Sequence, residues 1–198
     1  MREYRLDFSP AEPREAQEFV ELILMSGESF LEALLGPKVK DVLKTLYVET
    51  SNLFSHECCV FARLEQKIVG MMLGYDFSYA VKNRLRTGEL LLGQLGLLKL
   101  FRLIKLDRVL GRHEEGEFYL SNFAIYPQYR GKGFGKEMLE YCFDWAKKLG
   151  CSTVRLDVEK GNEIAMRLYS KMGFEVERES RIKLLNRTFE FVRMCRSI

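Results

Sequence analysis

A short stretch in the second half of the chain combines glycine with positive charge just before a helical pattern begins. It reads YRGKGFGKEM over 129–138, and its cations and glycines are Arg130, Gly131, Lys132, Gly133, Gly135 and Lys136. The first amide N–H groups of a helix lack intrahelical partners, and the helix dipole makes that end positive. Glycine lets a ligand approach the backbone closely. The pattern therefore predicts a site for an anion such as phosphate, with a loop of solvated charges as the alternative.

The spacing of these glycines excludes two common nucleotide-binding motifs. A Walker A loop needs serine or threonine after its lysine, but Glu137 follows Lys136. The dinucleotide fingerprint G-x-G-x-x-G needs glycine at the position of Lys136. The spacing that is present is R-x-x-G-x-G, from Arg130 to Gly135. A phosphate-bearing ligand would therefore have to be held in another way.

The elements around the loop should place it at the end of a strand. A strand is predicted at Glu117–Tyr126, before the loop, and a helix at Lys136–Leu149, ending at Gly150. A second strand at Thr153–Val158 and a short helix from Asn162 follow. A strand–helix–strand crossover makes the two strands parallel. A ligand is then expected at the carboxyl end of the first strand, where the loop lies.

The other predicted elements complete a mixed α/β domain. They are expected as a strand at 3–8, a helix around 19–24, a helical stretch at 29–53 broken near 36, an antiparallel hairpin at 58–77 turning at 65–67, and two C-terminal strands around 186. Between the hairpin and the strand at Glu117, the stretch Tyr79–Arg112 is leucine-rich and basic. We interpret it as one or two inserted helices, with a cationic row at Lys99, Arg102, Lys105 and Arg108.

Composition narrows the functional classes. The 198 residues suggest one domain, and a net charge of +3 is too small to indicate nucleic-acid binding by itself. Five cysteines without C-x-x-C and two histidines predict neither a disulfide framework nor a metal site. The most apolar segment, Glu89–Asp107, contains three cations that make a transmembrane helix unfavourable. Free thiols and a charged N-terminus favour a cytoplasmic protein.

Two motifs, taken together, resemble the GCN5-related N-acetyltransferases. The first is LSNFAIYPQYRGKGFG at 120–135, similar to the acetyl-CoA signature of that family. The second is NEIAMRLYSKMGF at 162–174, similar to its asparagine-to-tyrosine helix. The resemblance covers Glu117 to about Glu175 and implies one domain over 1–198. It also implies a mostly antiparallel mixed sheet flanked by helices, with a parallel unit at the cofactor cleft. The long insertion departs from the usual family pattern.

The resemblance implies acetyl-CoA as cosubstrate and no metal. The pyrophosphate would lie on the glycine loop, and the pantetheine would bond to the backbone of a strand that splays near the cofactor. The cofactor residues implied are Phe123, Ala124, Ile125, Arg130, Gly131, Lys132, Gly133, Phe134, Gly135, Lys136, Asn162 and Tyr169. Each has a structural alternative, such as sheet pairing, a solvated charge or a helix cap.

The reaction implied is direct transfer of acetyl to a primary amine of a peptide, protein or small molecule. Because the amine must be neutral to attack, a base helps, and the leaving thiolate gains from a proton donor. Tyr169 is the candidate acid, and Asp157 and Glu117 are the candidate bases. Asp157 is one carbon shorter than the glutamate at this position in some relatives. Tyr119 and Ser121 could relay a proton or simply line the cleft.

Two other classes remain open at this stage. The chain could be an acyl-CoA-binding module without catalysis, or a partner- or membrane-surface-binding protein built on the basic Leu90–Leu110 segment. For the leucines of the insertion, packing with a partial lid role comes first and a homodimer second, because one helix on a domain cannot bury them all. The acceptor amine is not identified by the sequence.

Overall fold

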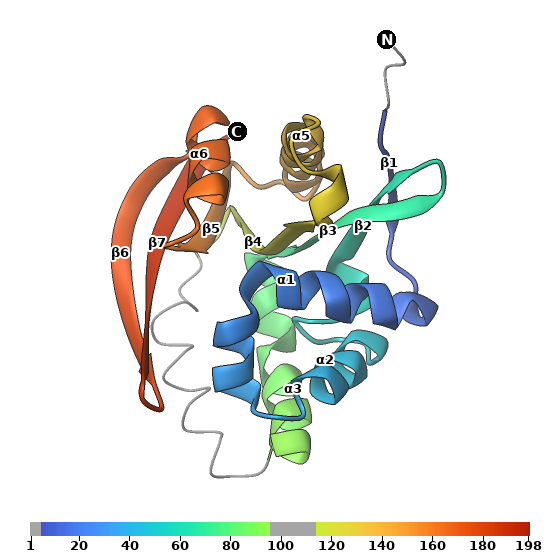
Figure 1. Cartoon of the computed structure of the whole chain (residues 1–198), viewed down its shortest axis with the longest axis vertical. Coiled ribbons are helices and arrows are strands. Elements are labelled where there is room, and N and C mark those ends of the chain that lie inside the picture. Colours follow the sequence, from blue (N-terminus) through green and yellow to red (C-terminus); the bar gives the residue numbers. More distant parts are fainter. Residues whose placement is uncertain (1–4, 96–113) are drawn as a thin grey trace.

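A computed structural model describes residues 5–95 and 114–198, and Figure 1 shows its arrangement. Seven strands form one sheet in the order β1-β2-β3-β4-β5-β7-β6. Their bounds are β1 Asp7–Pro10, β2 Cys59–Leu64, β3 Lys67–Asp76, β4 Glu117–Ile125, β5 Thr153–Glu159, β6 Glu175–Leu184 and β7 Arg187–Ser197. Among the strand pairs of residues 5–95 and 114–198, only β4–β5 is parallel. The mostly antiparallel sheet with one parallel unit is therefore confirmed.

Helices cover both faces of this sheet (Figure 1). The α-helices are α1 Ala16–Leu35, α2 Val39–Val48, α3 Phe77–Leu95, α5 Phe134–Lys148 and α6 Glu163–Lys171, and the short 3-10 helices are η1 Pro13–Glu15, η2 His56–Cys58 and η3 Pro127–Tyr129. The first three α-helices pack on one face, and α5 and α6 on the other. In the described part of the chain, no helix is long and apolar enough to cross a membrane.

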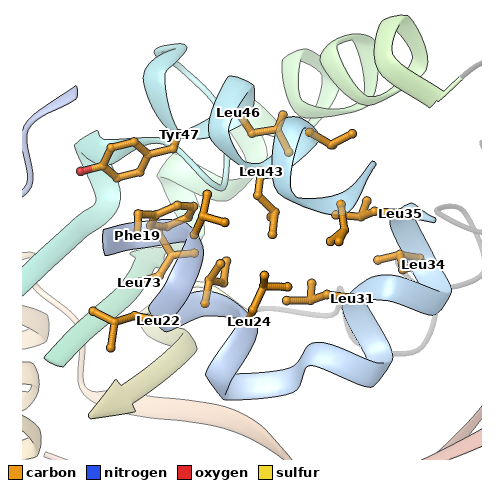
Figure 2. Close-up of a cluster of buried hydrophobic side chains, with 14 of the residues drawn as sticks. Phe19, Leu22, Leu24, Leu31, Leu34, Leu35, Leu43, Leu46, Tyr47 and Leu73 are labelled. Carbon is orange, nitrogen blue, oxygen red and sulfur yellow. The ribbon is translucent and has the colours of Figure 1, made fainter. Parts of the chain in front are cut away.

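A dense apolar cluster fixes α1 and α2 to the sheet. Figure 2 draws Phe19 and Leu22 of α1, Leu43 and Leu46 of α2, and Leu73 of β3 among the buried side chains of this cluster. All five are fully buried. Burying one such side chain contributes about 1.5–3 kcal/mol, so this cluster holds α1 firmly over β3 and β4.

Two irregularities in β4 shape the middle of the sheet. The register with β3 shifts between Leu73 and Gly74, which pair with Asn122 and Leu120, so Ser121 is the extra residue of a β-bulge. On its other edge, β4 pairs with β5 only from Glu117 to Tyr119. Bulges bend a strand and are frequent beside functional sites. The last six residues of β4 therefore diverge from β5 and leave one strand edge without a sheet partner.

Most element predictions are confirmed, with boundary corrections. The hairpin turns at Glu65 and Gln66, both in the left-handed region. Within the described residues, the first strand covers Asp7–Pro10 and does not include Arg5 or Leu6; the predicted residues 3 and 4 lie outside the described part of the chain. The predicted separation of the first two helical stretches near Ser29 corresponds to a kink at Gly27, where the backbone within α1 leaves helical geometry. The predicted break near Gly36 is also present, because α1 ends at Leu35 and α2 begins at Val39. The insertion begins as α3, but its predicted cationic row lies outside the described residues.

Candidate active site

A cavity of about 1250 Å³ opens where β4 and β5 diverge. Its walls come from β4, β5, the glycine loop and α6 on one side, and from α1 and α3 on the other. The cavity therefore joins the two motifs that predicted the site with helices from the N-terminal half. Most of the predicted site residues line it: Phe123, Ala124, Ile125, Arg130, Gly131, Gly133, Gly135, Lys136, Asp157, Asn162 and Tyr169.

The glycine loop has the geometry that the sequence predicted. Gly131 (φ 73°) and Gly133 (φ 86°) are in the left-handed region, which side chains other than glycine rarely adopt. A Cβ at either position would meet no atom within 4 Å, so the loop leaves open space for a ligand. At Gly135 a Cβ would lie 2.9 Å from Leu168, so this glycine lets α5 approach α6 closely. The start of α5 thus faces open space, as the predicted anion site requires.

Two of the predicted cofactor residues lie away from the cavity. The Lys132 ammonium lies 5.5 Å from the centroid of the Tyr129 ring, and Phe134 is buried in the core below α5. Neither side chain is among the described residues that line the cavity. Arg130 does line it, but its Nε donates to the Ile125 carbonyl at 2.9 Å. Arg130 thereby braces the loop against the end of β4.

Helix α6 brings its two predicted residues to the same wall. Asn162 caps the helix, because its Oδ1 accepts a hydrogen bond from the Ala165 amide at 3.1 Å. Tyr169 is buried (6% exposed), with its ring against Phe123 and Phe174. Burial, followed by the nearby Cys142, raises the pKa of Tyr169. Its phenol is therefore protonated at neutral pH, as a proton donor must be, but the raised pKa makes it a weaker acid than an exposed tyrosine.

Asp157 reaches the cavity but is tightly paired. Arg193 of β7 donates to both carboxylate oxygens, from Nε at 3.0 Å and from Nη2 at 2.8 Å. The Tyr119 hydroxyl donates to the same carboxylate at 3.0 Å. The Asp157 and Arg193 side chains are 3% and 2% exposed. Three donors thus hold this carboxylate, which leaves it little freedom to accept a proton from an incoming amine.

Glu117 lies at the other end of β4, where β4 still pairs with β5. It forms an ion pair with Arg155 and accepts a hydrogen bond from the Glu114 amide at 2.8 Å. Burial raises the pKa of Glu117, partly offset by that backbone hydrogen bond and by Arg155. It is not among the described residues that line the cavity. The geometry therefore gives the prediction of Glu117 as a base no support.

Sequence reasoning missed several residues of the cavity. On α1 the backbone leaves helical geometry at Gly27 (φ 179°, ψ 50°), and the adjacent Ser26 accepts a hydrogen bond from the Asn122 amide at 2.7 Å. Glu159, at the end of β5, also lines the cavity. Its alternation with Asp157 along β5 was the only available signal, because residues two apart on a strand share a face.

A comparison with models of protein families identifies the family of this chain. The model of the acetyltransferase (GNAT) family matches residues 28–174, most of the chain. The chain belongs to the GNAT family. This GNAT chain is 38% identical over 58 residues to the Escherichia coli (strain K12) [ribosomal protein bS18]-alanine N-acetyltransferase, covering 29% of the chain and 39% of that protein. It is 32% identical over 90 residues to the uncharacterized protein ML0378 of Mycobacterium leprae, covering 46% of the chain and 21% of that protein. Such relatives are thus matched over less than half their length.

Solved structures agree with the GNAT fold. An N-acetyltransferase from Staphylococcus aureus Mu50 has a TM-score of 0.70 at 19% identity, covering 96% of this chain and 99% of that one. A Bacillus subtilis acetyltransferase in complex with CoA has a TM-score of 0.57 at 15% identity, with 99% of both chains covered. These likenesses concern the fold. The acceptor of the GNAT chain, a homodimer, a cytoplasmic location and the extent of its domain stay predictions.

Proposed function

We propose that this protein transfers an acetyl group from acetyl-CoA directly to a primary amine, in the cavity between β4 and β5. The observation that carries the proposal is the meeting of three features in one cavity. These are the glycine-rich start of α5, the unpaired edge of β4 beyond Tyr119, and the buried phenol of Tyr169. The start of α5 could bind a pyrophosphate, the unpaired edge of β4 could bond to an amide-containing arm, and the phenol of Tyr169 could protonate a thiolate leaving group.

The fit to acetyl-CoA rests on open backbone groups. The amides at the start of α5 would hold the pyrophosphate, helped by the helix dipole. The free edge of β4 at Phe123–Ile125 would bond the pantetheine as a neighbouring strand would. Lys136, already within 3.6 Å of Glu140, is exposed and adds positive charge near the phosphates. These contacts position the thioester toward Tyr169.

The transfer balances in one sequence of bond changes. The acceptor ammonium first loses a proton to a base or to water. The neutral nitrogen then attacks the thioester carbon, a C–N bond forms, and the C–S bond breaks. The sulfur takes the proton of the Tyr169 hydroxyl, and the phenol regains a proton from the solvent or from the acetylated nitrogen. The products are an acetamide, CoA thiol and one released proton.

A matched pair of glycine variants tests the cofactor site. Gly133→Glu should abolish acetyl-CoA binding in calorimetry, because it places bulk and negative charge where the pyrophosphate would lie. Gly150→Glu is the control, since Gly150 has a similar φ of 78° and open surroundings at the far end of α5. Equal acetyl-CoA affinity in the two variants would refute the site.

A tyrosine variant tests the chemistry separately. Tyr169→Phe should lower turnover by about 10²–10⁴-fold, the typical contribution of a positioned proton donor, with acetyl-CoA affinity nearly unchanged. Tyr141→Phe is the control, because Tyr141 stacks on Phe8 at 4.2 Å outside the cavity lining among described residues. Acetyl-CoA binding with no turnover on any amine would instead favour a binding module.

A further inference from the structure

The half of the cavity formed by α1 and α3 is largely apolar. Phe30, Leu31 and Leu34 line it from the second half of α1, and Ala80 and Leu91 line it from α3. Figure 2 places Leu31 and Leu34 on the inner side of α1. This half lies opposite the cofactor loop, so it is where an acceptor would enter. A polar acceptor would leave its hydroxyl or amide groups without partners against such walls.

One acidic side chain stands at the junction of the two halves. Glu159 ends β5, lines the cavity and is half-buried. An added Cβ at Gly27 would lie 3.9 Å from its Oε1, so the carboxylate sits beneath the kink of α1. The structure records no hydrogen bond or ion pair for this carboxylate from any residue within 5–95 or 114–198. Burial raises the pKa of Glu159, and no charge from the described residues offsets this shift.

The Glu159 carboxylate lies next to the apolar side chains that line the cavity. Glu159 pairs with Phe191 across the β5–β7 ladder, so the two side chains lie on the same face. The Phe191 ring in turn meets the Phe30 ring of α1, with 5.0 Å between centroids in an edge-on contact. A ligand whose cationic group binds Glu159 would therefore extend along Phe191 and Phe30 into the half of the cavity between α1 and α3.

We propose that the acceptor is a primary amine carried on an extended apolar group, with its ammonium bound by Glu159 and its apolar body between α1 and α3. This inference rests on the proposed function, because it names the substrate class of the same site. Glu159 supplies the complementary charge that Asp157, paired to Arg193, does not. A long acyl chain on CoA would fill the apolar half but leave Glu159 unpaired.

A polyamine fits the described lining less well. It would place further cations along the apolar half. Glu89, another carboxylate lining that half on α3, is exposed and already lies 3.5 Å from Arg86. Arg84 adds a positive charge to the same helix. The lining charges on α3, one guanidinium and one carboxylate, thus give no net attraction for a second ammonium. A single ammonium with an alkyl or aryl body meets one carboxylate and apolar walls.

A homologous series of n-alkylamines, from ethylamine to decylamine, tests the substrate class. With acetyl-CoA present, thiol release should show kcat/KM rising about threefold to fourfold for each methylene that becomes buried. Calorimetry of the same amines, with CoA bound, should show the same gain in affinity. A kcat/KM that is flat or falling along the series, or turnover confined to polyamines or peptide N-termini, would overturn the proposal.

Two pairs of variants locate the acceptor. Glu159→Gln should raise the KM for decylamine by about 10-fold to 100-fold, as expected for loss of a charged hydrogen bond, and leave the KM for acetyl-CoA unchanged. Glu175→Gln, at an exposed position outside the described lining, is its control. Val81→Lys, at a cavity position on α3 that is 59% exposed, should remove the chain-length gain. Its control is Val48→Lys, at a position that is 45% exposed at the end of α2, and this variant should keep the gain with chain length.

These readouts separate the inference from the proposed function. If Glu159→Gln and Glu175→Gln have the same KM for decylamine, Glu159 does not bind the amine and the inference is wrong, even where acetyl transfer is observed. If acetyl-CoA neither binds nor turns over, the proposed function fails. Alkylamine affinity that still rises with chain length and depends on Glu159 would then support the amine site by itself.

Discussion

The part of β5 that lines the cavity carries two carboxylates with different surroundings. Asp157 and Glu159 lie two residues apart, on the same face of the strand, and both line the cavity. Asp157 is buried in a bidentate ion pair with Arg193 and accepts a third hydrogen bond from Tyr119. Glu159 has no recorded partner within the described ranges, and burial raises its pKa. The fold therefore pairs Asp157, whereas no described residue is recorded as a partner of Glu159.

This difference separates a structural charge from a binding charge. A buried carboxylate paired with its counter-ion links two strands, here β5 and β7. Removing one partner of this pair should lower the free energy of unfolding. A half-buried carboxylate without a counter-ion lowers stability, so its presence is more easily explained by a ligand that supplies the missing charge. The comparison therefore assigns Asp157 to the framework of the cavity and Glu159 to the acceptor.

The largest predicted effect comes from removing the cationic partner of Asp157, which leaves its carboxylate without a counter-ion. Arg193→Met keeps a long apolar side chain but leaves Asp157 as a buried charge without its counter-ion. The free energy of unfolding should fall by about 3–5 kcal/mol, the usual result of breaking a buried pair from one side. Urea denaturation followed by circular dichroism would measure the change.

A double variant controls for this loss. Arg193→Met combined with Asp157→Leu removes both charges, so most of the lost stability should return. If the double variant is as unstable as Arg193→Met alone, the loss reflects packing of the arginine stem, and the ion pair would not explain why Asp157 is held.

A smaller effect is expected from the third donor to Asp157. Tyr119→Phe removes the hydroxyl that donates to the carboxylate at 3.0 Å and leaves the ring in place. The free energy of unfolding should fall by about 1.5–3 kcal/mol, since the acceptor is charged, and kcat should change little. Thermal denaturation and thiol-release assays on one preparation would measure both. A large loss of kcat with unchanged stability would instead make Tyr119 part of a proton relay.

The geometry of the glycine-loop side of the cavity could be predicted because it depends on local sequence. The turn at Gly131 and Gly133, the start of α5 and the Asn162 cap each depend on a few consecutive residues. The strand–helix–strand order then places them at one edge of the sheet. The fold class followed from the same order, and the resemblance of the two motifs added an expectation that local chemistry could not supply, namely acetyl-CoA as cosubstrate.

The acceptor side could not be predicted because its partners come from distant segments. Arg193 lies 36 residues after Asp157, so the chain around Asp157 gives no sign that the carboxylate is paired. Glu117 looked equivalent as a base, but three-dimensional placement puts it where β4 and β5 are still joined. The kink at Gly27 interrupts a helix that has apolar residues on both sides of the kink. Its link to the cavity is visible only in the structure, where the adjacent Ser26 accepts a hydrogen bond from Asn122 of β4.

The smallest predicted effect concerns Glu159 and depends on pH. Because its pKa is raised in the folded state above the unfolded value of about 4.3, the folded protein binds this proton more tightly. Stability therefore falls as pH rises through the interval between the unfolded and folded pKa values, and the loss persists at neutral pH. Glu159→Gln should consequently raise the melting temperature slightly at pH 7, and the gain should disappear below about pH 4. Glu175→Gln should show no such trend in differential scanning calorimetry. A lower melting temperature for Glu159→Gln at pH 7 would mean that the carboxylate stabilises the free protein through a contact of its own, which would return it to the same class as Asp157.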